Sequence, residues 1–113
     1  RSLSRAIDEA RAAAALGVPL DEVLRAASSV LEAEEGVVPD YVAIVDDDDF
    51  TLLAGTGSAA EQVDKESRKK ALEAAATQGS LRARILLAAR VGATRLIDNA
   101  DVVISVAGGA RHE

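Results

Sequence analysis

Apolar residues recur at helical spacing over the first third of the chain. In residues 2–16 they fall three or four positions apart, at Leu3, Ile7, Ala10 and Ala14. Gly17 follows as a C-terminal cap, so the pattern predicts an amphipathic helix over 2–16. Pro19 is expected in the first turn of a second helix, which Gly36 ends. The connection between them is short, which makes the two helices antiparallel neighbours.

Alternating patterns in the rest of the chain predict strands. Residues 40–45 are rich in β-branched and aromatic side chains, and the aspartates at 46–49 end this segment. Apolar residues alternate over 81–91, and after Gly92, which indicates a bulge, a bend or a close backbone approach, a third strand is expected near 95–103. The prediction is an α+β two-layer sandwich, a small antiparallel sheet of about three strands with helices packed on one face.

The segment between these strands has a different pattern. Ser58 followed by Glu61 has the spacing of a helix capping box, and residues 59–77 are strong helix formers. Val63 and Leu72 are the only large apolar residues there. We therefore expect a surface helix over 59–77 that packs weakly.

Composition limits the class of protein. A chain of 113 residues is a single domain, and with one Phe, one Tyr and no Trp its core is built from aliphatic residues. The absence of cysteine excludes disulfides and zinc–thiolate sites. A net charge of −6 argues against nucleic acid as a partner. No apolar run approaches the roughly 20 residues of a membrane span and no signal peptide is seen, so we expect a soluble domain.

Arginines mark the polar face of the 81–91 segment. The alternation places Arg82, Arg84 and Arg90 on the face opposite its apolar residues, and Arg95 follows beyond Gly92. Guanidinium groups suit anions because they donate in a fork. Antiparallel sheets also commonly leave one face in water. We therefore interpret the row as a solvated face and name no phosphate site on it.

Three further motifs contain residue types that can bind phosphate or a metal ion. Gly55 and Gly57 stand in a Gly-x-Gly-x-x-Ala turn similar to a phosphate-binding loop, but the favoured interpretation is a flexible turn with a helix cap, because the required parallel βαβ unit is not predicted. The aspartates at 46–49 suit a hard cation but lack the spacing of a calcium loop, which favours a solvated turn. His112 has no second histidine or cysteine to share a metal, so we expect a frayed terminus.

Residues 84–99 carry the most specific string in the chain. An apolar strand is broken by Gly92 and followed by Thr-Arg-Leu-Ile-Asp-Asn. This segment resembles the C-terminal signature of the pantothenate synthetase (pantoate–β-alanine ligase) family, Val-Gly-Thr-Thr-Arg-Leu-Ile-Asp-Asn, from which only Ala93 departs. Residues 3–6 and 37–46 are similar to the first C-domain helix and the Asp-Tyr-initiated strand of that family. The resemblance leaves out roughly 56–80 and the last dozen residues.

The resemblance implies a function in coenzyme A biosynthesis. The family adenylates pantoate with ATP and magnesium, and β-alanine then attacks the acyl adenylate to give pantothenate. It does so with an N-terminal Rossmann-like domain that carries His-x-Gly-His and Ser-Ser-Arg-Asn, and neither motif occurs in residues 1–113. Since the chain begins without methionine, we expect only the cytoplasmic C-terminal lid domain. Its expected partner is the N-terminal domain, with pantoate, β-alanine and ATP as ligands of the complete enzyme.

The resemblance also implies that residues 1–113 form no complete active site. We expect them to be inactive alone, to bind no cofactor, and to contain no catalytic, cofactor-binding or metal-binding residue. Two alternatives remain. A free-standing interaction module requires the helix at 59–77 to order against a second copy, and a small nucleotide-binding protein requires Gly55 and Gly57 to cradle a phosphate.

Overall fold

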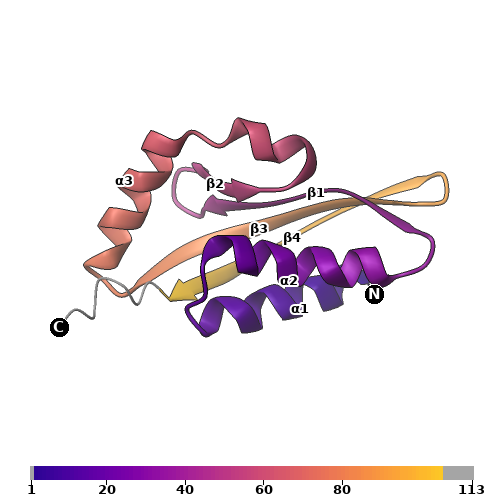
Figure 1. Cartoon of the computed structure of the whole chain (residues 1–113), viewed down its shortest axis with the longest axis horizontal. Helices are drawn as coiled ribbons and strands as arrows, with labels where there is room; N and C mark the ends of the chain where they lie inside the picture. Colours follow the sequence, from indigo (N-terminus) through magenta and orange to yellow (C-terminus); the bar gives the residue numbers. More distant parts are fainter. Residues whose placement is uncertain (1, 106–113) are drawn as a thin grey trace.

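The computed structural model describes residues 2–105. Among these residues no helix is long and apolar enough to cross a membrane. A helical layer lies against an antiparallel sheet (Figure 1). The elements are, in chain order, α1 (Ser2–Ala15), α2 (Leu20–Ala33), β1 (Val37–Asp46), β2 (Leu52–Gly55), the 3₁₀ helix η1 (Gly57–Gln62), α3 (Lys65–Ala76), β3 (Ser80–Val91) and β4 (Thr94–Ser105).

Both N-terminal helices form where the apolar spacing predicts them. The N–H of Gly17, whose φ is 78°, donates to the carbonyl of Ala14 at 3.1 Å, which is the glycine cap expected after α1. Pro19 is the N-cap of α2 and so lies one position outside the first turn that the sequence predicted for it. The two helices run antiparallel and pack along each other (Figure 1).

The sheet has four strands in the order β2-β1-β3-β4, all antiparallel. The α+β class is confirmed, and the additional strand is β2, whose four residues are too few to show an alternating pattern. β1 begins at Val37, three residues earlier than predicted. Its pairing with β3 is irregular between Pro39 and Tyr41, which is where a strand accommodates a residue that lacks an N–H.

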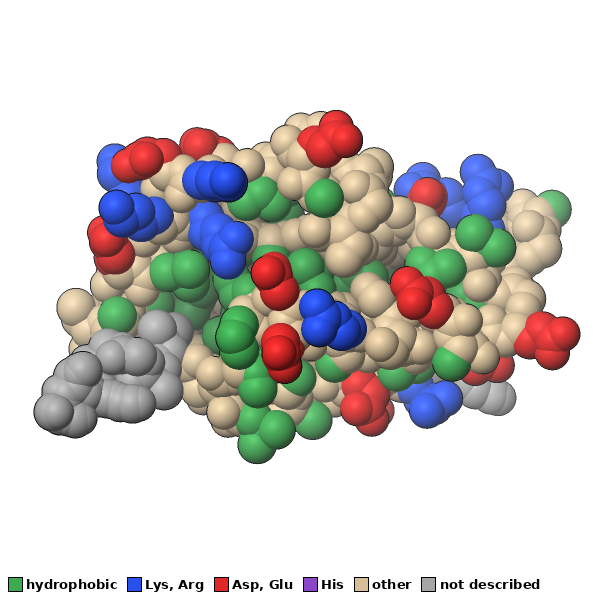
Figure 2. Space-filling model, in the orientation of Figure 1, with side chains coloured by type: hydrophobic (Ala, Val, Ile, Leu, Met, Phe, Trp, Pro, Cys, Tyr) green, Lys and Arg blue, Asp and Glu red, His purple; other side chains and the backbone are tan. Residues whose placement is uncertain are grey.

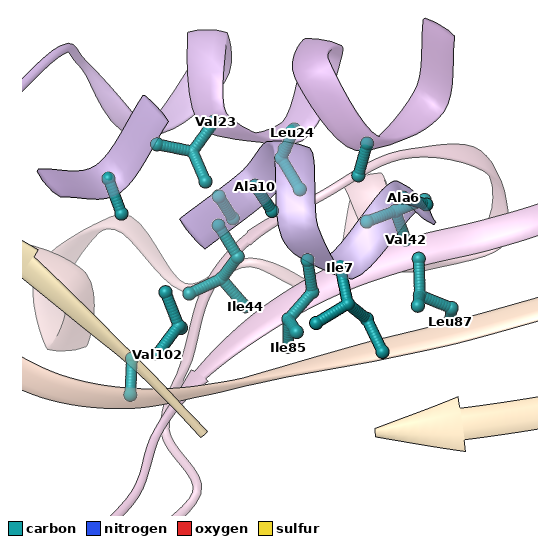
Figure 3. Packing of buried hydrophobic residues seen from close by; sticks show 14 of the residues in the cluster. Ala6, Ile7, Ala10, Val23, Leu24, Val42, Ile44, Ile85, Leu87 and Val102 are labelled. Atoms are coloured by element: carbon teal, nitrogen blue, oxygen red, sulfur yellow. The ribbon is translucent and has the colours of Figure 1, made fainter. Parts of the chain in front are cut away.

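One face of the sheet packs against α1 and α2 and forms the core (Figure 3). α1 contributes small residues with no exposed surface, so its backbone lies close to the sheet; these are Ala6, Ala10 and Ala14. α2 contributes larger ones, and Leu24 and Leu31 are 4% and 0% exposed. On β3 the predicted apolar face is buried from Ala83 to Ala89, while Val91 is 40% exposed.

Residues 56–80 form two short helices where one was predicted. η1 has no buried residue and α3 buries only Ala75, which confirms that the segment packs weakly. The predicted capping box at Ser58 is wrong, because Ser58 lies inside η1, whose N-cap is Thr56. α3 is instead capped by Asp64, whose carboxylate accepts a hydrogen bond from the N–H of Glu66 at 3.3 Å.

The irregularity predicted at Gly92 is a hairpin turn. β3 and β4 pair along their whole length, from Ser80 with Ser105 to Val91 with Thr94, and two residues join them. Gly92 has a φ of 65°, which suits the first central position of a type II′ turn. No atom lies within 4 Å of where a Cβ on Gly92 would stand, so the bend is present and the close approach is not.

Candidate functional site

The arginines predicted to share one face of the sheet do share it. Arg82, Arg84 and Arg90 alternate with the buried residues of β3 and lie on the face away from α1 and α2. Arg95 pairs directly with Arg90, and opposite residues in antiparallel strands lie on the same face. We call these four residues the arginine face, the feature of the fold best suited to an anion.

Two members of the arginine face are engaged by acidic residues. Nε of Arg84 lies 3.1 Å from Oδ1 of Asp47, and Nη1 of Arg84 donates to Oδ1 of Asn99 at 2.8 Å. Nε of Arg95 on β4 lies 3.1 Å from Oδ2 of Asp40 on β1, so this pair spans β3. The side chains of both pairs are 32–45% exposed, and such surface pairs stabilise by about 0–1 kcal/mol. They tie strands together and leave less donor capacity for a ligand.

The other two members lie far apart. Arg82 and Arg90 take part in none of the ion pairs formed within residues 2–105. They are eight positions apart on one strand, which at about 3.3 Å per residue separates them by about 26 Å. They cannot bind one phosphate together. The interpretation of the row as a solvated face therefore stands, and it makes no converging anion site.

The turn with Gly55 and Gly57 is built for packing and not for a phosphate. It joins an antiparallel strand to a six-residue 3₁₀ helix, whereas a phosphate loop joins a parallel strand to an α-helix. The turn is also held to β1, because the N–H of Thr56 donates to the carbonyl of Val42 at 2.8 Å and Oγ1 of Thr56 accepts from the N–H of Val42 at 3.0 Å. The geometry does not provide the nucleotide site of the alternative interpretation.

Close backbone contact explains both glycines. A Cβ on Gly57, whose φ is 59°, would overlap the carbonyl oxygen of Asp40. A Cβ on Gly55 would stand 2.7 Å from the Cβ of Ala59. Any larger residue would force η1 away from β1 and β2.

A groove of ≈ 700 Å³ runs between α2 and the glycine turn. Oγ of Ser28 is buried at its base and has no hydrogen-bond partner within the described part of the chain. Arg25 and Glu32 line the same groove with opposite charges. Among residues 2–105 no base lies within hydrogen-bond distance of the Ser28 hydroxyl, so this part of the chain does not give the groove the paired groups that nucleophilic catalysis needs.

The aspartates at 46–49 form the turn between β1 and β2, as expected. Oδ1 of Asp46 accepts from the N–H of Asp48 at 2.8 Å, so this carboxylate serves the turn itself. The backbone N–H and then the hydroxyl of Thr51 donate to Asp49 and lower the pKa of that carboxyl below its ordinary value. Because the pKa is lower in the folded state, the ionised carboxylate stabilises the fold at pH values above the ordinary carboxyl pKa. This stabilisation is lost as the pH falls through the folded-state pKa.

Metal-ligating side chains do not gather in the part of the chain that the structure covers. No group of three His, Cys, Asp or Glu residues there has the geometry to hold a metal ion. The prediction for His112 lies outside the described residues. Asp40 and Asp47 were not predicted as arginine partners, because the paired residues are far apart in the sequence. Asp40 is 55 positions from Arg95, and Asp47 is 37 positions from Arg84.

Comparison with known proteins places the chain in a family. The sequence profile described as Pantoate-beta-alanine ligase matches residues 1–101. The chain belongs to the pantoate-beta-alanine ligase family. A relative named Pantothenate synthetase 4, from Frankia alni, is 34% identical over 103 residues, which is 91% of this chain and 25% of the relative. The chain thus spans about a quarter of the length of this relative.

The match is longer than the resemblance in the sequence suggested. It runs from residue 1 to residue 101, whereas the resemblance left out roughly 56–80. The string that carries it, residues 91–99, forms the β3–β4 hairpin turn and the start of β4. Residues 91–99 thus lie at the end of the sheet that is farthest from α3 (Figure 1).

Proposed function

We propose that residues 1–113 are the C-terminal lid domain of a pantothenate synthetase. The observation that carries the proposal is the family match over residues 1–101, combined with a relative about four times as long as the matched segment. In the complete enzyme, ATP with magnesium adenylates pantoate with release of pyrophosphate, and β-alanine attacks the pantoyl adenylate to form pantothenate and release AMP. The lid closes over ATP and the adenylate while the N-terminal domain binds them.

Closure has a physical purpose in this reaction. An acyl adenylate is hydrolysed when water reaches it before the amine does, and a closed lid excludes water from the site. A lid must move without deforming. One aliphatic core joins α1, α2 and all four strands, which supports movement as a single body.

The proposal assigns the chemistry to the N-terminal domain. The His-x-Gly-His and Ser-Ser-Arg-Asn motifs that the resemblance associates with adenylation do not occur in the 113 residues. The arginine face is divided between ion pairs and two widely separated side chains. We therefore expect the chain alone to form no pantothenate, in the cytoplasm or in the test tube.

The test is a domain exchange. Residues 1–113 replace the segment of the Frankia alni relative that aligns with them, and pantothenate formation is measured from pantoate, β-alanine and ATP. We expect turnover by the chimera and none by the isolated chain. An ordered but inactive chimera, or turnover by the isolated chain free of full-length contaminant, would overturn the proposal.

A second measurement isolates the lid role. With β-alanine omitted, AMP released by the chimera reports hydrolysis of the adenylate. Removing residues 1–113 from the chimera should raise the ratio of AMP to pantothenate measured with all substrates present, because water then reaches the adenylate. An unchanged ratio in the truncated enzyme would mean that the domain does not shield the intermediate.

A further inference from the structure

The β3–β4 hairpin extends past the helices and leaves apolar side chains uncovered. We call residues 89–97, with residues 37–39 of β1 beside them, the hairpin arm. Seven large hydrophobic residues are exposed within the described chain, and four of them lie on this arm: Val38 (62%), Val91 (40%), Leu96 (39%) and Ile97 (63%). Four of the seven thus lie at one end of the molecule, Val38 and Ile97 on the face away from the helices and Val91 and Leu96 on the helix-facing side.

The arm is uncovered because the helical layer stops short of it. Leu87 and Ala89 on the helix-facing side of β3 have no exposed surface, but Val91 on the same side does. Ile97 lies on the opposite face, where neither α1 nor α2 packs. Figure 1 shows the hairpin reaching beyond the ends of both helices. Exposed apolar residues gathered in this way are typical of an interaction surface.

Polar groups lie among the apolar residues of the arm. Arg90 is exposed on β3 and takes part in none of the ion pairs among residues 2–105. Arg95 is held against Asp40 at 3.1 Å. Figure 2 shows basic and hydrophobic side chains next to each other at this end of the molecule. Arg90 is opposite Val38 on β1 and Arg95 on β4, so arginine stands between the apolar residues of this face. Arginine is among the residues enriched at protein interfaces.

The start of α1 lies at the same end as the arm. Figure 3 places Ala6 and Ile7 of α1 over Leu87 and Ile85, and α1 runs from there toward the opposite end of the sheet. A domain joined before Ser2 therefore emerges at the same end of the molecule as the arm, on the helix side of the sheet. It can reach the arm through a short connection, which lowers the entropy cost of the contact.

We infer that the hairpin arm is the surface by which this domain docks on the N-terminal catalytic domain of its own polypeptide. This inference rests on the proposed function, which places that domain before Ser2. The occupant is a largely apolar surface of the catalytic domain, with Ile97 and Val38 buried against it and Arg90 between them. The arm then decides where the lid sits when it closes.

The test uses the active chimera and a matched pair of variants. Ile97→Ser removes an apolar residue from the arm, and Val103→Ser is its control, because both lie on β4, on the same face, at 63% and 54% exposure. We expect Ile97→Ser to lower pantothenate formation by about tenfold and to raise AMP release per pantothenate, as loss of a buried interface anchor does. Val103→Ser should leave both unchanged.

The outcomes separate this inference from the proposed function. An inactive wild-type chimera refutes the function. An active chimera in which the two variants behave alike, with urea midpoints equal to wild type, overturns the arm and leaves the function standing. Sedimentation of the 113-residue chain adds a second check. A dimer that Ile97→Ser dissociates would mean that the arm binds a second copy, which also overturns the inference.

Discussion

At the scale of single residues, the loops hold the least favourable backbone conformation in the structure. Phe50 has a φ of 61°, and it is the only residue other than glycine with a positive φ between residues 2 and 105. It ends the turn between β1 and β2, where its N–H donates to the carbonyl of Asp46 at 2.9 Å. Its side chain is 66% exposed, so little packing compensates for the strain.

Phe50→Gly should therefore stabilise the domain by about 1 kcal/mol, because glycine adopts this conformation without a steric penalty. The measurement is the urea midpoint with an unchanged m-value. Phe50→Ala is the control, since it removes the ring but retains the Cβ that causes the strain, and it should change stability little. Equal stabilisation by both variants would trace the effect to the exposed ring.

Gly92→Val should destabilise the domain by about 1–3 kcal/mol. The position has a φ of 65° and open space around it, so the cost comes from the backbone alone and not from a clash. Ala93→Val is the control in the same turn, because Ala93 does not have a positive φ. A urea melt in which the two variants lose the same stability would show that the turn does not depend on glycine.

At the scale of elements, burial distinguishes the helices and strands that form the core from those that lie on the surface. α2 inserts Leu31 fully into the cluster that the sheet shares, whereas α3 buries only Ala75. The sequence predicted this contrast, since α2 has a continuous apolar stripe and the 56–80 segment has few large apolar residues. What it did not predict is that Thr56 and Gly57 contact β1, Thr56 by hydrogen bonds to Val42 and Gly57 by its close approach to the Asp40 carbonyl.

Replacing residues 64–78 by a Gly-Ser loop of equal length should cost less than about 2 kcal/mol, because few buried side chains are lost. Leu31→Ala should cost about 2–5 kcal/mol, although it changes one residue. Both follow from urea unfolding of the same chain. The replacement keeps Thr56, whose hydrogen bonds to Val42 hold β2 in place. A larger loss from the loop than from Leu31→Ala would make α3 part of the core.

At the scale of the whole molecule, one cluster of aliphatic residues joins both N-terminal helices to all four strands. β1 and β3 are the central strands, paired on both sides, and β4 is an edge strand. Arg11 on α1 helps to hold that edge, because its Nε donates to the carbonyl of Asp101 at 3.0 Å. Stability should therefore be highest at the centre of the sheet and lowest at its periphery.

Native-state hydrogen exchange should show this order. We expect the amides of β1 and β3 under the helices to exchange only by global unfolding, and those of α3 and the hairpin arm to exchange by local opening. If the inferred docking is correct, the amides of the arm become protected in the active chimera. Equal protection of α3 and β3 in the isolated chain would contradict the division into core and periphery.

The sequence by itself determined the local elements. Helical spacing fixed α1 and α2, and alternation fixed β3 with its arginines on one face, because each pattern depends on neighbours a few positions away. The string at residues 91–99 was enough to indicate the family, which the profile match then confirmed. The aspartates at 46–49 were correctly predicted to turn the chain.

Only the tertiary structure decided what depends on distant residues. β2 is too short to carry a pattern and is defined by its pairing with β1. Gly55 and Gly57 had a motif open to two interpretations, which the contact of Gly57 with the Asp40 carbonyl resolved in favour of packing. The partners of Arg84 and Arg95, and the length by which the hairpin outreaches the helices, also follow from chain segments that meet only on folding. Contacts of this kind have no periodicity along the sequence, so no local pattern could have predicted them.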